Sequence, residues 1–201
     1  MAMANRYPHW VFLKGNHEDL LLDALLFHCR LYGSYHLWWE QGGQATAQSY
    51  RPHDASASER ALMRPCDYIP LAHLVWLAAR PLYYATDRYL FVHAGLRPGI
   101  PLAQQERRNL LWIRDEFIAA AADFGGKQVV FGHTPLREPL VMPNKIGIDT
   151  MGAGRGTLTA VELSGPEPVL YHQEAKEGPW PADMRCRYTD GAATQAITAI
   201  R

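Results

Sequence analysis

Apolar and polar positions along the chain predict strands that alternate with helices. Three short apolar runs, each followed by glycine within three residues, predict buried strands at 10–14 (WVFLK), 89–92 (YLFV) and 128–131 (QVVF). Leucines at helical spacing predict a helix over 18–31, directly after the first strand and a short turn. Two acidic residues in the first turn of this helix suit its dipole.

Further helices are predicted over 68–79 and 102–123, and the polar stretch 42–58, which contains Gly, Pro and Ser, predicts a loop. The last third is rich in β-branched residues, and it predicts short antiparallel strands at 145–150, 157–163 and 169–173. Helices interleaved with strands, followed by a run of strands, indicate a layered α/β domain. The length of 201 residues suits a single domain over 1–201.

The composition is globular, with 48% apolar and 20% charged residues. Twenty basic residues balance twenty acidic ones, which weighs against a nucleic-acid partner and against attraction to a membrane surface. Every apolar run is shorter than the roughly 20 residues that a membrane-spanning helix needs. Three scattered cysteines do not form a disulfide framework. We therefore predict a reduced, cytoplasmic protein.

Three turns combine a predicted strand end with a side chain that can bind a metal. They are Gly15-Asn16-His17-Glu18, His93-Ala94-Gly95 and Gly132-His133-Thr134. Strand ends are where α/β sheets place ligand sites. Imidazoles and an amide oxygen can hold a divalent ion such as Mn, Fe or Zn, and such an ion can polarise a phosphoryl oxygen.

Each of these turns also has a purely structural interpretation. A lone histidine after a strand is usually a hydrogen-bonded structural residue, and Gly-Asn alone is more often a turn than a ligand. Arg114 lies among apolar residues in LLWIRDEF, where packing would fix it for bidentate phosphate recognition, although a surface ion pair is a fair alternative. The spacing therefore suggests a site and leaves both interpretations open.

Six segments in one order resemble the calcineurin-like metallophosphoesterases, and especially the bacterial and phage serine/threonine protein phosphatases. These segments are GNHEDLLLDAL, LWWEQGGQAT, YLFVHAG, LLWIRDEF, VVFGHTP and IGIDTMGAGRGTLTAVEL. The similarity covers about 10–163 and leaves a C-terminal strand and tail at 164–201. The resemblance implies a layered β-sandwich flanked by helices.

The resemblance also implies a role for each matching residue. Asn16, His93 and His133 match ligands of the second metal, His17 matches the general acid, and Arg114 matches an arginine that binds the substrate phosphate. Members of this family hydrolyse phosphomonoesters with a metal-activated water and two ions, commonly manganese. The implied substrate is therefore a phosphorylated protein or a small phosphoester.

The chain departs from the family pattern before Gly15. The family begins with an Asp-x-His strand and a strand ending in GDxxDRG, which supply the remaining metal ligands, and neither precedes GNHE here. We therefore expect an N-terminally truncated member of the family. Because the matching ligands are all neutral and two dications repel each other, we expect at most one bound ion.

Two alternatives to the protein phosphatase stay open from the sequence. The first is a nucleotide phosphohydrolase like the diadenosine tetraphosphatases, which share GNHE-type turns. The second is an inactive, metal-poor remnant that serves as a binding module, because the first-metal ligands are absent from the sequence.

Overall fold

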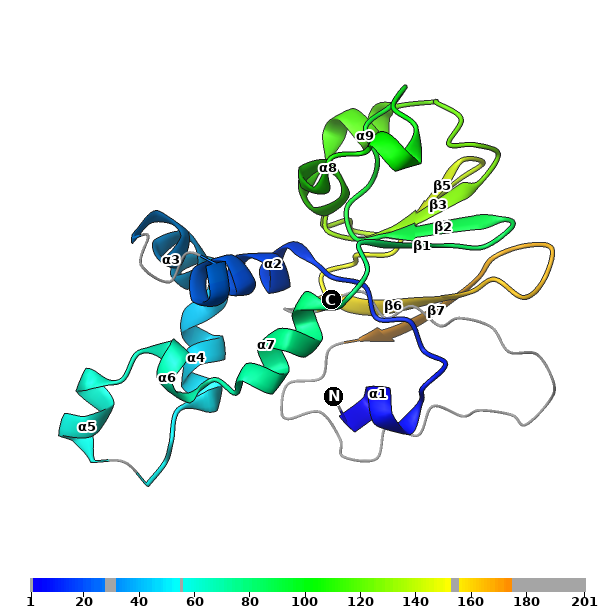
Figure 1. Ribbon diagram of the computed structural model, residues 1–201. Helices are drawn as coiled ribbons and strands as arrows, with labels where there is room; N and C mark the ends of the chain where they lie inside the picture. Colours follow the sequence, from blue (N-terminus) through cyan, green and yellow to red (C-terminus); the bar gives the residue numbers. More distant parts are fainter. Residues whose placement is uncertain (1, 28–31, 55, 153–155, 175–201) are drawn as a thin grey trace. The chain divides into compact units, whose positions relative to one another are not determined.

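The computed structural model describes residues 2–27, 32–54, 56–152 and 156–174 (Figure 1). The chain divides into two compact units. The helical unit comprises Met1–Tyr7 and Lys14–Pro81, and the sheet unit comprises Pro8–Leu13 and Leu82–Arg201. None of the helices that the structure describes is long and apolar enough to pass through a membrane.

Short helices make up the helical unit. They are α1 (Ala2–Arg6), α2 (Asn16–Leu22), the π-helical turn η1 (Asp23–Phe27), α3 (Tyr32–Trp38), the π-helical turn η2 (Trp39–Gly43), α4 (Gln44–Tyr50), α5 (Ala57–Leu62), α6 (Pro65–Tyr68) and α7 (Leu71–Ala78). The helix predicted over 18–31 is confirmed as far as Phe27, and its last four residues lie outside the described ranges. The helix predicted over 68–79 begins later, at Leu71, because Pro70 occupies the N-cap position.

The loop predicted over 42–58 is wrong for most of its length, because α4 lies within it and α5 begins there. Its alanine and glutamine residues are good helix formers. Ala47, which is 1% exposed, packs inward while most of the helix faces solvent. A polar helix of this kind lacks the apolar stripe by which helices are identified in a sequence.

The sheet unit is built on a five-stranded mixed sheet. Its strands are β1 (Tyr83–Ala85), β2 (Tyr89–Val92), β3 (Gln128–Phe131), β4 (Leu140–Met142) and β5 (Lys145–Gly147), in the spatial order β1-β2-β3-β5-β4. β2, β3 and β5 run parallel, and the edge strands β1 and β4 run antiparallel to their neighbours. The predicted strands at 89–92 and 128–131 are confirmed to the residue.

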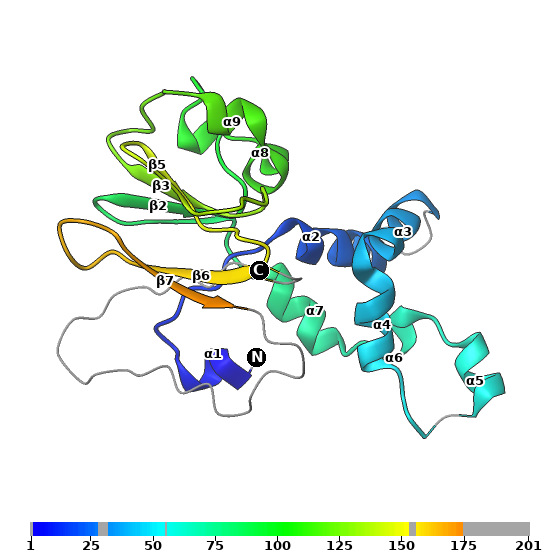
Figure 2. The ribbon, with the colours of Figure 1, turned by 180° about the vertical axis from the view of Figure 1, so that it is seen from behind.

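Helices cover one face of the sheet and a hairpin covers the other (Figures 1 and 2). The hairpin is the antiparallel pair β6 (Thr157–Glu162) and β7 (Val169–Glu174). Alternate strand residues divide between the two faces. Leu90, Val92, Val129 and Phe131 pack with α8 (Arg107–Trp112) and α9 (Asp115–Ala119), whereas Tyr89, Phe91, Val130 and Ile146 pack with Val161 of β6. The layered α/β architecture predicted from the sequence is confirmed.

Two predictions about the strands are wrong. Residues 10–14 form no strand, although Leu13 packs against the core under the hairpin. Apolar content predicts burial, but a strand also needs a neighbour that accepts its backbone hydrogen bonds. The segment predicted at 145–150 forms β5, which is parallel to β3 and antiparallel only to β4. Strand direction depends on the chain's path between strands, which local composition does not fix.

The helix predicted over 102–123 is broken into three pieces, namely the 3-10 turn η3 (Leu102–Gln104), α8 and α9. Arg114, between α8 and α9, has φ −133° and ψ −105°, which are not helical angles. Leu110 and Phe117, which are 3% and 0% exposed, anchor the two helices separately in the same core. The break at Arg114 therefore lets each short helix bury its own apolar residue.

Phe117 leaves no room for a side chain at Gly95, in the turn after β2. Its ring contacts Phe131 and Phe124, with centroids 5.0 and 5.3 Å away. A Cβ atom at Gly95 would lie 2.3 Å from Cδ1 of Phe117, and Gly95 has φ +154°. Glycine is therefore required at this position by both packing and backbone conformation.

We predict that Gly95→Ala lowers the free energy of unfolding by about 2–4 kcal/mol, because it overpacks the core and strains the backbone. Urea unfolding followed by tryptophan fluorescence measures this. Gly99→Ala is the matched control, since Gly99 has φ +75° and open space around the added Cβ; its expected cost is about 1 kcal/mol. Equal losses in the two variants would contradict the packing argument.

Candidate functional site

The turn after β2 carries His93 and is tied to α8. The amide of Ala94 donates to the carbonyl of Leu110 at 2.9 Å, which joins this turn to the helix that covers the sheet. His93 is 4% exposed. The buried strand and the helix together therefore fix the backbone from which the imidazole projects.

The turn after β3 carries His133 and is tied to the His93 turn. The amide of Gly132 donates to the carbonyl of His93 at 2.8 Å. Because β2 and β3 are adjacent and parallel, their carboxyl ends reach the same edge of the sheet. The two imidazole rings therefore lie close together, with centroids 5.0 Å apart and planes inclined by 57°.

The His133 turn holds an unfavourable local conformation. His133 has φ +64°, in the left-handed region that few residues other than glycine adopt. The hydroxyl of the next residue, Thr134, is buried and has no hydrogen-bond partner among the described residues. Backbone strain of this kind costs about 1–3 kcal/mol and occurs most often at functional sites.

Arg114 supports the same turn from the helical side of the sheet. Its Nη1 donates to the carbonyl of His133 at 2.7 Å. The residue as a whole is exposed, so the rest of its guanidinium can meet a ligand. Trp112, two residues earlier, presents its ring edge-on to His133 with centroids 5.7 Å apart. Sequence pattern alone gave Trp112 no role, although its position two residues before Arg114 was a usable signal.

The two imidazoles fit the requirements of a shared divalent ion. A metal–imidazole bond is about 2.0–2.1 Å long, so two rings on one ion have centroids about 5 Å apart, as these have. Over the described ranges there is no cluster of three or more His, Cys, Asp and Glu side chains with metal-site geometry. Among the described residues of the sheet unit, the candidate metal ligands are thus the His93 and His133 imidazoles.

Asn16 and His17 lie in the helical unit, in the first turn of α2. The amide of Gly15 donates to Oε2 of Glu18 at 2.9 Å, which caps the helix at the predicted turn. Asn16 is 4% exposed, whereas His17 is exposed. The structure therefore brings three of the five predicted residues together in the sheet unit, and it places the other two side by side in the helical unit. Their roles stay predictions.

Comparison with known proteins finds one similar phosphatase sequence and one similar fold. No family model matches the chain. Over 155 residues it is 29% identical to serine/threonine-protein phosphatase 1 of Salmonella typhimurium, which corresponds to 75% of this chain and 65% of that protein. The chain thus spans just under two thirds of the length of this relative. In fold the chain is similar to a crystal structure of a protein designated a diadenosine tetraphosphatase, with a TM-score of 0.54 and 19% sequence identity. The match covers 85% of this chain and 71% of the tetraphosphatase chain.

The similarity to serine/threonine-protein phosphatase 1 confirms the resemblance drawn from the ordered motifs. The histidines of HAG and GHTP share one sheet edge, as the motif spacing predicted.

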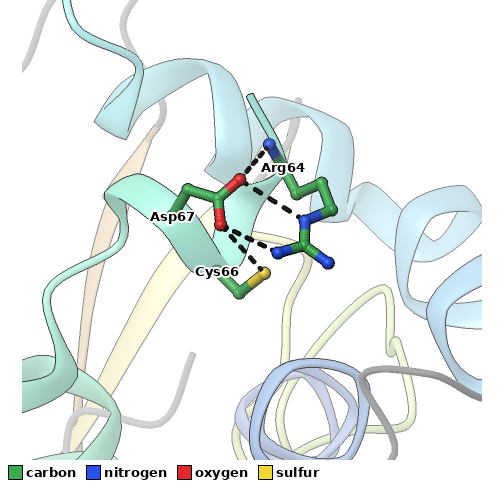
Figure 3. Close-up of polar contacts among 3 residues, drawn as sticks. All are labelled: Arg64, Cys66 and Asp67. Atoms are coloured by element: carbon green, nitrogen blue, oxygen red, sulfur yellow. Dashed lines mark hydrogen bonds and ion pairs between the residues drawn. The ribbon is translucent and has the colours of Figure 1, made fainter. Parts of the chain in front are cut away.

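Cys66 is exposed, but its surroundings do not favour a nucleophile (Figure 3). Asp67 caps α6 by accepting the Arg64 amide at 2.8 Å, and it also accepts from the Arg64 guanidinium. The Cys66 thiol donates to the same carboxylate at 3.8 Å. Desolvation, and then the Asp67 charge, raise the pKa of the Cys66 thiol, so its reactive thiolate is disfavoured at neutral pH.

We predict that Asp67→Asn lowers the pKa of Cys66, because it removes the negative charge and leaves Arg64 unopposed. At pH 8 the thiolate fraction, and with it the rate of alkylation by iodoacetamide, should rise about two- to fivefold. Mass spectrometry of the Cys66 peptide measures the rate. Glu59→Gln is the control, because Glu59 caps α5 in the same way and is not among the charges that affect Cys66. A rate unchanged by Asp67→Asn, or raised equally by Glu59→Gln, would contradict the assigned cause.

Proposed function

We propose that this chain carries part of the active site of a metal-dependent phosphomonoesterase that acts on phosphoserine or phosphothreonine. The main support is the pairing of the His93 and His133 imidazoles at 5.0 Å beside Arg114. The likeness to a serine/threonine-protein phosphatase supports the choice of substrate. Manganese is the ion we propose, because the family resemblance implies it.

His93 and His133 would hold the ion through neutral ring nitrogens. An ion bound there supplies Lewis-acid chemistry toward a phosphoryl oxygen. The two histidines contribute no negative charge to offset a second dication, so a single ion fits them best. Their burial keeps the rings in one orientation, and the Arg114 bond to the His133 carbonyl fixes the turn that carries the second ring.

Arg114 would bind the phosphate of the substrate. One nitrogen of its guanidinium is engaged by the His133 carbonyl, which sets the plane of the group and leaves other N–H donors for phosphate oxygens. This arrangement reduces the entropy that a long exposed side chain loses when it binds an anion.

Asn16 and His17 complete the proposed set. Asn16 would contribute an amide oxygen to the ion, and His17 would protonate the leaving oxygen of the substrate. Both assignments rest on the GNHE motif. His17 lies on the exposed surface of the first turn of α2, so its ring is available to exchange a proton.

The proposal predicts metal-dependent release of phosphate. The purified chain with added Mn²⁺ should hydrolyse p-nitrophenyl phosphate, and EDTA should abolish turnover. Arg114→Ala should lower kcat/KM by about 10- to 100-fold, because a charged hydrogen bond to phosphate is lost. Arg88→Ala is the control, since Arg88 binds the Gly165 carbonyl, away from the paired histidines. No turnover together with no bound Mn²⁺ would contradict the proposal and favour a metal-poor binding module.

A nucleotide phosphohydrolase is the second candidate, because the fold is similar to that of a protein designated a diadenosine tetraphosphatase. The same preparation can be offered a phosphoserine peptide and diadenosine tetraphosphate in parallel. A larger kcat/KM for the peptide supports the protein phosphatase. A larger value for the dinucleotide would replace it with the second candidate.

The proposed roles separate the histidines by their effect on metal content. We predict that His93→Ala or His133→Ala reduces Mn²⁺ affinity by at least about tenfold, because each change removes one of the proposed ligands of the ion. His17→Ala should lower kcat and leave affinity for the metal nearly unchanged. Isothermal titration with Mn²⁺ measures the affinity, and His36→Ala, on the surface of α3, is the control. Comparable metal loss in all variants would count against these roles.

A further inference from the structure

A lysine is completely buried on the helical side of the sheet. Lys145, the first residue of β5, is 0% exposed. Its Nζ donates to the carbonyls of Phe117, Ile118 and Ala120 at 2.6, 3.1 and 2.6 Å. The ammonium also lies 4.7 Å from the centroid of the Phe117 ring. Burying a charged ammonium group costs desolvation free energy, and several hydrogen-bond acceptors are needed to compensate for it.

The preceding residue binds the same stretch of backbone. Nδ2 of Asn144 donates to the carbonyls of Ala120 and Ala122 at 3.3 and 2.9 Å. Asn144 and Lys145, which we call the Asn144–Lys145 clamp, thus hold the end of α9 and the residues just beyond it. The last carbonyls of a helix have no partners within the helix, and a cation is favourable next to them.

The other end of α9 is Arg114. The amides of Phe117 and Ile118 donate to the Arg114 carbonyl at 2.9 and 3.0 Å, so the arginine backbone belongs to the first turn of the helix. Its guanidinium then reaches the His133 carbonyl. The clamp and the guanidinium therefore act on opposite ends of one helix of five residues.

A helix this short is not stable by itself, so its position depends on its anchors. Phe117 is one anchor and the clamp is another. A third contact, between Arg97 and Glu116 at 3.3 Å, joins two side chains that are each more than half exposed. Surface ion pairs of this kind contribute little. The buried clamp is thus the main polar restraint on α9.

We propose that the Asn144–Lys145 clamp positions Arg114 for phosphate binding by fixing α9 from its far end. The inference rests on the proposed function, in which Arg114 binds the substrate phosphate. It makes Lys145 and Asn144 positioning residues, which touch neither the ion nor the phosphate. Loss of the clamp should let α9 shift, so that the guanidinium samples several orientations.

The test compares Lys145→Met and Asn144→Ala with a matched control, Lys127→Met. Lys127 also donates to two backbone carbonyls of the sheet unit, those of Thr86 and Asp87, at 2.5 and 2.9 Å, but it does not hold α9. Two readouts apply to the full chain. Side-chain NMR follows the Nε–H signal of Arg114, identified by its loss in Arg114→Ala. Titration with inorganic phosphate in the presence of Mn²⁺ measures the affinity.

Lys145→Met should shift or broaden the Arg114 signal and weaken phosphate binding about tenfold, and Asn144→Ala should do so about threefold. Lys127→Met should change neither. In the Arg114→Ala background the clamp variants should cause no further loss, because their effect passes through the arginine.

An unchanged Arg114 signal, or an equal loss of phosphate affinity with and without Arg114, would overturn the inference. If Lys145→Met does not fold, Asn144→Ala decides the matter alone, since it removes only the partly buried half of the clamp. Phosphate binding that survives Arg114→Ala would instead overturn the proposed role of Arg114. In that case the Nε–H signal of Arg114 in the clamp variants would still decide whether the clamp positions the side chain.

Discussion

Parallel hydrogen bonding between β2 and β3 places Leu90 beside Val129 and Phe91 beside Val130. In a parallel pair both chains leave the sheet at the same edge, so the turns that follow are neighbours without any further adjustment. His93 and His133 come directly from those turns, and the bond from the Gly132 amide to the His93 carbonyl extends the pairing into them. The proximity of the imidazoles is therefore a consequence of strand direction.

The helices that cover the sheet hold the turns in conformations they would not adopt alone. The positive φ of His133 is unfavourable for an isolated loop. Burial of Phe117 and Phe131 in the core beneath the helices contributes against that local cost. The same helices place Arg114 and Trp112 in contact with His133. Stability of the core and geometry of the site are thus coupled through α8 and α9.

Two cationic side chains of the sheet unit, Arg114 and Lys145, are held by backbone carbonyls. Arg114, beside the histidine pair, is bound through a backbone carbonyl, so that its charge remains available to an anion. The buried charge of Lys145 is met by carbonyl dipoles and an aromatic ring, and desolvation lowers the pKa of this amine. Each of these two cations is thus held by backbone carbonyls at helix ends and turns.

The sequence by itself determined the strands β2 and β3, the helix start at GNHE, and the resemblance to serine/threonine protein phosphatases, because short apolar runs ended by glycine and ordered motifs are local signals. It also predicted that His93, His133 and Arg114 belong together. Local pattern could not give the break at Arg114, the helix α4 or the direction of β5, which depend on what each segment packs against. Only the tertiary structure revealed Trp112 against His133 and Lys145 beneath α9. Those contacts join residues far apart in the chain, and hydrophobic periodicity carries no information about which distant carbonyl or ring a side chain meets.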